Sequence, residues 1–164
     1  MSVTECDRCS ATTRTGARCK QRTCKYAEFC WQHTKQLLHL GVRDSAIPAA
    51  GQGLFTYVDI PAKRVICSYD GENISRAAYD ANRSNYGIRV PGGRVIDGAS
   101  TQSSIGRYAN NCRPADKAAG HCRRNNAKYS ISTRAGVSTI NIKSTKPIPA
   151  GGEIFVAYGS GFWD

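Results

Sequence analysis

Ile-Gly-Arg-Tyr-Ala-Asn-Asn-Cys, residues 105–112, is the stretch from which the rest of the chain is best interpreted. An Arg-Tyr pair followed by two adjacent Asn residues disfavours both a strand and a helix. A short polar segment of this kind is typical of a turn that holds a ligand inside a β-rich domain. Two further stretches accompany it, Gly51-Gln52-Gly53 upstream and residues 152–159 (GEIFVAYG) downstream. Together they contain several of the candidate functional residues.

The pattern around these stretches is that of a mainly β protein. Short apolar or β-branched runs alternate with Gly, Pro, Asn and Asp, and Pro91-Gly92-Gly93 marks a hairpin turn. In this part of the chain only Ser75–Asn82 has a helical pattern. Many short strands joined by tight turns predict a β-dominated architecture. The expected strands are Gly53–Val58, Arg64–Tyr69, Tyr86–Val90, Arg94–Ile96, Tyr129–Thr133, Val137–Ile142 and Glu153–Ala157.

Five stretches, read in order, resemble the SET domain of protein lysine methyltransferases. A lone GxG is common in turns, so the order and spacing of all five carry the resemblance, which covers nearly all of residues 47–159. It implies a SET domain at 44–164, with small curved sheets and a C-terminal segment threaded through a loop as a pseudoknot. The five stretches are Ala50–Phe55, Val65–Glu72, Val95–Gly98, Gly106–Cys112 with the later Asn125-Asn126, and Lys146–Tyr158.

The resemblance also implies S-adenosylmethionine as the cofactor. Gly residues suit such a site because no side chain blocks close approach of the backbone. Asn110 is expected to bind the amino-acid end of the cofactor, and the main chain of Asn111 its adenine edge. Most relatives have His where this chain has Asn111. The full set of expected cofactor residues is Gly51, Gln52, Gly53, Tyr86, Arg107, Asn110, Asn111 and Trp163.

Tyr158 matches the catalytic Tyr of the family. Methyl transfer to an amine needs a neutral lysine, whose ordinary pKa is about 10.4, and an apolar channel disfavours the ammonium form. A channel hydroxyl that holds a water or the lysine nitrogen limits the number of methyl groups added, so we expect mono- or dimethylation. The expected lysine-channel residues are Tyr69, Tyr129, Val156 and Phe162.

The chain ends Ser-Gly-Phe-Trp-Asp, without the C-terminal Cys cluster familiar in this family. We expect Trp163 to cover the adenine and Phe162 to help close the lysine channel. The alternative is a frayed aromatic tail.

Residues 1–43 form a separate Cys-rich module. Hardly any aliphatic side chains accompany Cys6, Cys9, Cys19, Cys24, Cys30 and His33, so the segment needs a staple other than a core. Zinc supplies one through four thiolate or imidazole ligands, for which these six residues compete. The segment resembles a short Cys/His zinc motif of large DNA viruses and some protists. That resemblance selects Cys9, Cys19, Cys30 and His33; the alternative is a set of reduced, unligated thiols.

Two further expectations concern the parts that connect these sites. Thr34–Leu40 is predicted as a short helix that stops at Gly41 and packs its Leu residues onto the main domain. Cys67, Cys112 and Cys122 are expected to be structural thiols. The charged insert Arg113–His121 is interpreted as a solvated loop, with a contact to substrate or DNA as the alternative.

The formal charge of +11 indicates an acidic partner. Residues 1–43 hold eight Lys/Arg and three Asp/Glu, or +5, so the module is expected to dock on nucleic acid or a nucleosome. No secretory signal or membrane-spanning run is visible, which predicts an intracellular chain, in the nucleus (a host nucleus if viral) and without a membrane partner. No motif reports the oligomeric state, and a homodimer is compatible with the sequence.

The predicted function is therefore that of an S-adenosylmethionine-dependent lysine methyltransferase acting on a histone tail. One alternative is a catalytically inactive SET fold that binds chromatin or nucleic acid. Another keeps the enzyme but gives it a non-histone substrate.

Overall fold

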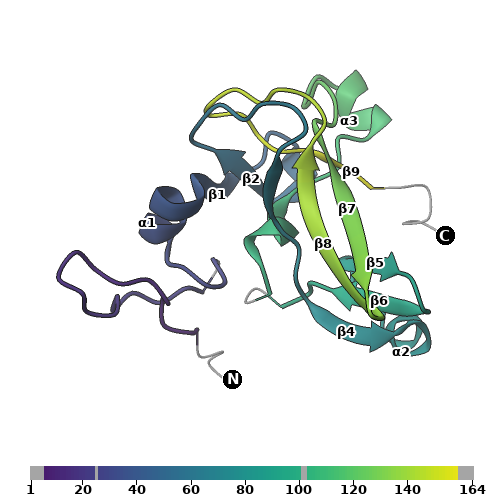
Figure 1. Ribbon diagram of the computed structural model, residues 1–164. Helices are drawn as coiled ribbons and strands as arrows, with labels where there is room; N and C mark the ends of the chain where they lie inside the picture. Colours follow the sequence, from purple (N-terminus) through teal and green to yellow (C-terminus); the bar gives the residue numbers. More distant parts are fainter. Residues whose placement is uncertain (1–5, 25, 101–102, 159–164) are drawn as a thin grey trace.

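Nine strands in three small sheets surround one hydrophobic core in the computed structural model, which describes residues 6–24, 26–100 and 103–158 (Figure 1). The strands are β1 (Leu40–Asp44), β2 (Gln52–Thr56), β3 (Val65–Ser68), β4 (Glu72–Ser75), β5 (Gly87–Val90), β6 (Arg94–Asp97), β7 (Ala127–Arg134), β8 (Val137–Ser144) and β9 (Val156–Ala157). The helical segments are α1 (Trp31–His33), the π-turn η1 (Thr34–Leu38), the 3-10 turns η2 (Pro48–Ala50) and η3 (Ile105–Tyr108), α2 (Arg76–Ala81) and α3 (Pro114–Ala118).

The sheets confirm the predicted mainly β class. β1 pairs antiparallel with β2, the second sheet has the order β3-β8-β7-β9, and the third has the order β4-β6-β5. All seven predicted runs overlap a strand, and the predicted helix is α2, whose Ser75 hydroxyl accepts a hydrogen bond from the Ala78 amide. β1, β4 and α3 were not predicted.

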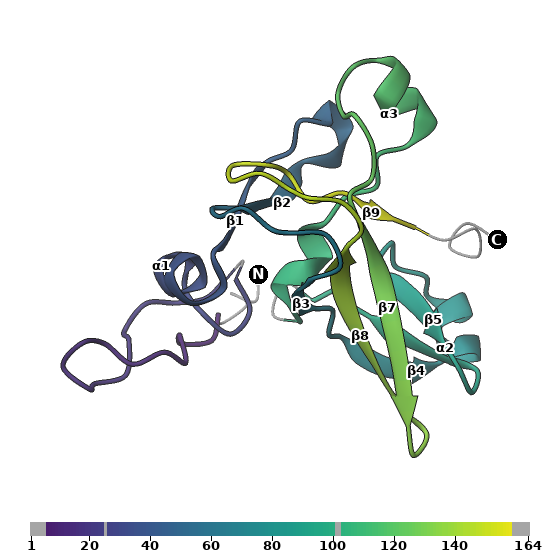
Figure 2. The same ribbon diagram turned by 45° about the horizontal axis from the view of Figure 1, so that its top comes forward.

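The longest element is the β7–β8 hairpin, whose tip projects from the domain in Figure 2. Near its base, alternate residues of β8 (Ile140, Ile142 and Ser144) are buried, as the two-residue period of a strand requires. Val137 at the tip is 62% exposed. The base of the hairpin therefore forms one wall of the core.

The C-terminal segment passes between two distant parts of the chain. On one side the Val156 amide donates to the Asn110 carbonyl at 2.8 Å, and the Ile154 amide to Leu54 at 2.8 Å. On the other side β9 runs parallel to the start of β7, with Val156 opposite Ala127. The segment is thus paired on both sides, which is the neighbourhood that the expected pseudoknot requires.

Asn126 fixes the threaded segment in register. Its side-chain Nδ2 donates to the Glu153 carbonyl at 2.9 Å, and its Oδ1 accepts from the Phe155 amide at 2.9 Å. Ile154 and Val156 are fully buried in the core, so the segment that ends at Tyr158 is held by both packing and hydrogen bonds.

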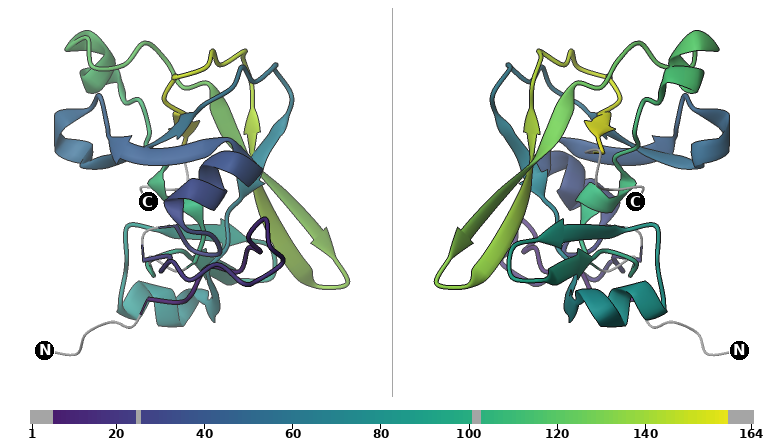
Figure 3. Two further views of the ribbon diagram at one scale, coloured as in Figure 1. Left: turned by 90° about the vertical axis from the view of Figure 1, so that its left-hand side faces the viewer. Right: turned by 90° about the vertical axis from the view of Figure 1, so that its right-hand side faces the viewer.

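The N-terminal module lies on one side of the domain and reaches it through α1 and β1 (Figure 3). Tyr26 packs against the main core and donates to the Val42 carbonyl at 3.3 Å. β1 continues through residues 43 and 44, so the module and the SET part share this strand. In the described part of the chain no helix is long and apolar enough to span a bilayer.

The predicted helix Thr34–Leu40 needs correction. Helical structure runs from Trp31 to Leu38, His39 takes a left-handed conformation (φ 56°), and Leu40 begins β1. Leu37 and Leu38 are exposed, so the prediction that they pack on the domain is wrong; only Leu40 is buried. Gly41 is a packing residue, because a Cβ there would lie 2.7 Å from the Tyr57 hydroxyl.

Candidate active site and metal centre

A cavity of about 600 Å³ collects most of the polar residues singled out from the sequence. Its size is within the range of small-molecule sites. The predicted residues that line it are Gln52, Tyr86, Arg107, Asn110, Asn111 and Tyr158.

The Asn110 side chain joins the first two sequence stretches. Chain direction changes after η3, where Ala109 is extended (φ −70°, ψ 118°). Asn110 Nδ2 then donates to the main-chain carbonyl of Gln52 at 2.8 Å. Both residues line the cavity, and the hydrogen bond fixes their separation.

Gly51 and Gly53 are not among the residues that line the cavity, although Gln52 between them is. Gly51 has a φ of 68°, a conformation that Gly adopts without strain, where the chain leaves η2. Gly53 is buried against the carboxylate of Glu153, which a Cβ at residue 53 would overlap. That carboxylate accepts hydrogen bonds from the Ser45 hydroxyl (2.6 Å) and the Ala46 amide (2.9 Å). Backbone conformation therefore explains Gly51, and close packing explains Gly53, without a contact to a ligand.

Arg107 forms a fixed part of the cavity wall. Its guanidinium lies 4.2 Å from the ring centroid of Tyr86 and 5.0 Å from that of Tyr108. It also donates to the carbonyls of Gly98 (3.0 Å) and Ala99 (3.1 Å). The aromatic rings and the carbonyls hold the cation in one place.

Asn111, which stands where relatives have His, belongs to a side-chain clamp. Its Oδ1 accepts from Asn125 Nδ2 at 2.9 Å, while Asn125 Oδ1 accepts from the Cys112 amide at 2.8 Å. The clamp holds together the two ends of the loop between η3 and β7.

Three tyrosines form a continuous aromatic cluster behind the cavity. Tyr129 contacts Tyr69 edge-on with centroids 5.4 Å apart, and stacks on Tyr158 with centroids 6.0 Å apart and planes inclined by 13°. The Tyr158 hydroxyl donates to the Ala109 carbonyl at 2.9 Å, and the Tyr69 hydroxyl to that of Tyr86 at 2.6 Å. Tyr158 alone of the three lines the cavity, so it stands where the cluster and the cavity meet.

Burial keeps these phenols protonated. Desolvation raises the pKa of Tyr158 to about 12 and also raises the pKa values of Tyr69 and Tyr129, because the phenolate is disfavoured away from water. At neutral pH the cluster therefore presents hydroxyl groups and no anion.

Two of the predicted channel residues, Val156 and Phe162, are not seen in the aromatic cluster that the described residues form. Val156 is fully buried in the main core, two residues before Tyr158. Phe162 and the expected adenine cover Trp163 lie outside the described residues.

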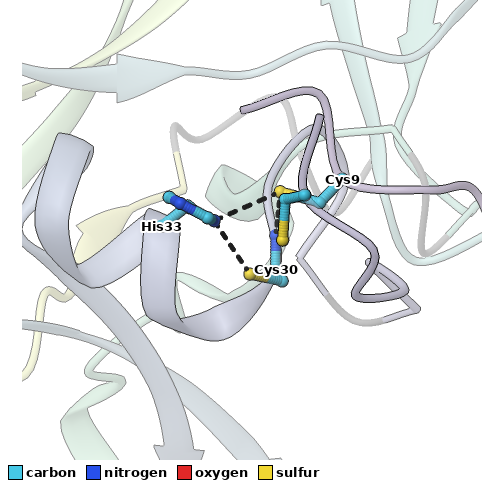
Figure 4. Close-up of side chains that lie close together, drawn as sticks. Cys9, Cys30 and His33 are labelled. Atoms are coloured by element: carbon cyan, nitrogen blue, oxygen red, sulfur yellow. Dashed lines mark hydrogen bonds between the residues drawn. The ribbon is translucent and has the colours of Figure 1, made fainter. Parts of the chain in front are cut away.

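The four predicted zinc ligands converge in the N-terminal module. The ligand atoms of Cys9, Cys19, Cys30 and His33 all lie within 4.8 Å of one another. His33 Nδ1 is 3.5 Å from Cys9 Sγ and 3.2 Å from Cys30 Sγ (Figure 4), close to the edge of about 3.5 Å that zinc–ligand bonds of 2.0–2.3 Å give a tetrahedron. Three thiolates and an imidazole are a zinc donor set, so the residues fit the ion.

Two disulfides account for four other cysteines. Cys6 pairs with Cys24 and thereby leaves the competition for zinc. Cys112 pairs with Cys122, so the expectation that both are free structural thiols is wrong. Their Cα atoms lie 5.9 Å apart, within the range that a disulfide bridges. Cys67 is free, as expected.

Arg8 and Arg18 brace the metal-binding loops. Arg8 donates to the carbonyls of Cys19 (2.8 Å) and Arg18 (2.9 Å), and Arg18 to those of Cys9 (3.1 Å) and Arg8 (2.9 Å). Two of the basic side chains in this module thus hold the carbonyls of two ligand residues.

Comparison with known proteins agrees with this geometry. Residues 51–159 match the SET domain family. The chain belongs to the SET domain family. No curated protein matches it. The SET fold here is thus that of a protein lysine methyltransferase, with a Cys/His cluster before it that could hold zinc.

Solved structures give the same fold. A humanized mutant of the Chaetomium thermophilum Polycomb Repressive Complex 2 bound to the inhibitor GSK126 is 25% identical with a TM-score of 0.61, over 76% of this chain and 15% of that one. The apo complex in an autoinhibited state gives 25% identity and a TM-score of 0.59, over 73% and 15%. This SET chain therefore spans about 15% of the length of those chains.

SET methyltransferases use S-adenosylmethionine, and the cavity of about 600 Å³ is within the size range of small-molecule sites. The side chain of Asn110, expected at the amino-acid end, and the ring of Tyr86 both line this cavity. Of the expected cofactor residues, Gln52, Tyr86, Arg107, Asn110 and Asn111 line the cavity.

Sequence reasoning missed part of this SET site. Arg113 and Asp116 line the cavity from α3, inside the insert that was interpreted as a solvated loop. Pro114 at the first helical position and Asp116 in the first turn are a helix-start pattern, which gives a signal for α3 but none for its place beside the cavity. The remaining lining residues that sequence did not single out are Ile47, Ala49, Ala50, Asn85 and Tyr108.

Proposed function

We propose that this chain is an S-adenosylmethionine-dependent protein lysine N-methyltransferase that acts on a histone tail. The observation that carries the proposal is the position of Tyr158. It lies at the end of the threaded segment, lines the cofactor cavity, and stacks on the buried pair Tyr129 and Tyr69. A cavity for the methyl donor and an aromatic cluster suited to a lysine side chain thus meet at one hydroxyl.

The cofactor brings the reactive methyl group on its sulfonium, and the protein residues contribute orientation. Asn110 and Gln52 fix the amino-acid end, and Arg107 with Tyr86 fixes the adjoining wall. Because a hydrogen bond joins Asn110 to Gln52, this part of the site is ordered before the cofactor binds. Pre-ordering of this kind reduces the entropy lost on reaching a reactive geometry.

The lysine channel favours a neutral amine without a charged base. Three buried phenols with raised pKa values offer no anion that would stabilise an ammonium group. The Tyr158 hydroxyl keeps its proton and is oriented by the Ala109 carbonyl at 2.9 Å. Its role is to orient the lysine nitrogen.

We infer mono- or dimethylation from the same cluster. The hydroxyl of Tyr129 neighbours that of Tyr158, so it limits the space for a third methyl group. Tyr129→Phe should raise the methylation state of the product, and an unchanged product distribution would refute this inference.

The test of activity uses labelled S-adenosylmethionine and core histones. Wild type should transfer label, and Tyr158→Phe should lower the rate by about a hundredfold or more, as loss of an orienting hydroxyl does at other active sites. Tyr57→Phe is the matched control, because Tyr57 is exposed and lies outside the cavity. Transfer to another protein but not to histones would support the non-histone substrate instead.

The alternative of a binding protein without catalysis rests on the charge of the N-terminal module. Arg14, Lys20 and Arg22 are exposed there and can reach phosphates. One guanidinium nitrogen of Arg22 also donates to the Cys6 carbonyl. DNA or nucleosome binding that weakens steeply with salt, without methyl transfer, would favour it. For an enzyme on histones the same surface is a nucleosome contact in the nucleus. Sedimentation would decide whether a homodimer forms.

A further inference from the structure

We propose that Asp116 is a cofactor-binding residue specific to the α3 loop of this chain, and that the Cys112–Cys122 disulfide holds it in the cavity wall. The proposal rests on the proposed function, since the ligand is S-adenosylmethionine or its demethylated product. It adds a carboxylate, and a covalent support for it, to the polar residues already described.

The loop that carries Asp116 is closed at both ends. Asn111 and Asn125 are joined by their side chains at 2.9 Å, and the disulfide links Cys112 to Cys122 just inside them. Within the loop, α3 begins at Pro114, and the His121 amide returns to the Asp116 carbonyl at 3.0 Å. A ten-residue separation between the two cysteines is thus filled by a short ordered helix.

Asp116 is the buried member of this otherwise exposed helix. It is 8% exposed, whereas residues 113–115 and 117–120 are all exposed. Burial of a single carboxylate on a surface helix is unusual, because a charge loses hydration unless polar partners replace it. Asp116 is also one of the residues that line the cavity.

The Asp116 carboxylate accepts hydrogen bonds from the guanidinium of Arg113. Arg113 donates from Nε to Oδ2 at 2.8 Å and from Nη2 to Oδ1 at 3.4 Å. A carboxylate accepts about four hydrogen bonds, so capacity remains for donors inside the cavity. A carboxylate accepts only, which selects groups that donate: the hydroxyls of a ribose or an ammonium group.

The disulfide connects the loop to the rest of the wall. Cys112 is 7% exposed and packs with Ile47 (2%) and Phe155 (7%), while Cys122 packs against the same cluster. Ile47 itself lines the cavity, and Phe155 belongs to the threaded segment that ends at Tyr158. Opening the disulfide should therefore remove the covalent link between the Cys122 end of the loop and this cluster.

Reduction gives a redox test of this support. A dithiol reductant breaks the Cys112–Cys122 bond by supplying two electrons and two protons, which yields two thiols, and the reductant becomes a disulfide. Without the disulfide the loop loses conformational entropy when the cofactor binds, and this loss lowers the affinity for the cofactor.

The first experiment measures S-adenosylhomocysteine affinity by calorimetry. Asp116→Asn should weaken binding by about tenfold, the effect of losing one hydrogen bond to a charged group. Asp80→Asn is the matched control, since Asp80 also pairs with an Arg three residues away but lies on exposed α2. Equal affinity of Asp116→Asn and wild type would overturn the proposal. Methylthioadenosine, which lacks the amino acid, distinguishes the donors: an equal loss with it assigns the ribose, and no loss assigns the ammonium.

The second experiment tests the disulfide. The double variant Cys112→Ser with Cys122→Ser should weaken S-adenosylhomocysteine binding by about tenfold, because binding must then order the loop. The double variant Cys6→Ser with Cys24→Ser removes the other disulfide, whose cysteines do not line the cavity, and should bind as wild type does. Equal affinities of all three proteins would refute the support role.

A measurement on wild type covers the case in which a variant misfolds. S-adenosylhomocysteine should slow hydrogen exchange of the amides in residues 113–121, and unchanged exchange there despite binding would overturn the proposal. Wild type that binds no S-adenosylhomocysteine would refute the proposed function itself. Binding with no effect at Asp116 or in the loop would refute only this inference.

Discussion

The side-chain amide of Asn110 donates a hydrogen bond of 2.8 Å to the main-chain carbonyl of Gln52, which lies 58 residues earlier in the chain. The main-chain carbonyl of Asn110 meanwhile accepts from Val156, two residues before Tyr158. One residue therefore joins the GxG turn, the polar turn after η3 and the C-terminal segment. The cofactor cavity exists where these three parts meet.

Asn110→Ala should lower both stability and cofactor affinity. Loss of the partly buried hydrogen bond is expected to reduce the free energy of unfolding by about 1–3 kcal/mol. S-adenosylhomocysteine affinity should fall by about tenfold or more, because the amino-acid end loses a partner. Denaturant unfolding and calorimetry measure the two effects, with exposed Asn82→Ala as the control. Wild-type affinity in a folded Asn110→Ala protein would contradict this role.

Gly53→Ala should destabilise the fold from a position outside the cavity. A Cβ at residue 53 overlaps the Glu153 carboxylate, which must then leave the Ser45 hydroxyl and the Ala46 amide. Overpacking of this kind costs about 1–3 kcal/mol. Gly120→Ala provides the comparison, since it has open space and a positive φ of 76°, and should cost about 1 kcal/mol. Urea unfolding that ranks the two variants in the opposite order would refute the packing explanation.

Zinc should bind in one equivalent and hold the N-terminal module together. Metal analysis of the purified protein is expected to give one zinc per chain, because one four-residue cluster is present in the described part of the chain. Cys30→Ser or a strong chelator should unfold the module, since binding energy is folding energy in such sites. Cys67→Ser, a free cysteine outside the cluster, is the control and should retain zinc. A metal content near zero in fully reduced and folded protein would exclude the site.

Alkaline pH should destabilise the protein through its buried tyrosines. The pKa of Tyr158 is raised to about 12 by burial, above an ordinary value of about 10, so the neutral phenol is favoured in the folded state. The resulting stability is fully present below pH 10 and is lost as the pH rises through about 12. Thermal unfolding midpoints should therefore fall in this window. Tyr158→Phe should flatten the decline, and an equal decline in that variant would assign it to other groups.

The sequence predicts the chemistry of this site better than its boundaries. The resemblance to the SET family placed Tyr69 and Tyr129 in the lysine channel and Tyr158 at the catalytic position. That the three rings form one cluster is a finding of the structure. The zinc ligands were likewise predicted from a resemblance, to a short Cys/His motif. Both the tyrosines and the zinc ligands were predicted from motifs whose order and spacing can be read from one sequence.

Other features could not be read from the sequence, for physical reasons. Gly41 was interpreted as a helix stop because Gly commonly ends helices. Its packing against the ring of Tyr57 is a tertiary contact, which the sequence does not display. Disulfide pairing depends on Cα separation in the folded chain, which cysteine spacing does not report. The helix-start pattern at Pro114 was visible, but the position of Asp116 in the cavity wall depends on how the insert folds back.

Mass spectrometry of a histone peptide panel, after incubation with S-adenosylmethionine, tests the proposed enzyme most directly. Wild type should add one or two methyl groups to a lysine, Tyr57→Phe should do the same, and Tyr158→Phe should methylate the peptides more slowly, by about a hundredfold or more. The contradicting result has two parts, both obtained with folded, zinc-loaded wild type. The peptides and core histones stay unmethylated, and the protein does not bind S-adenosylhomocysteine.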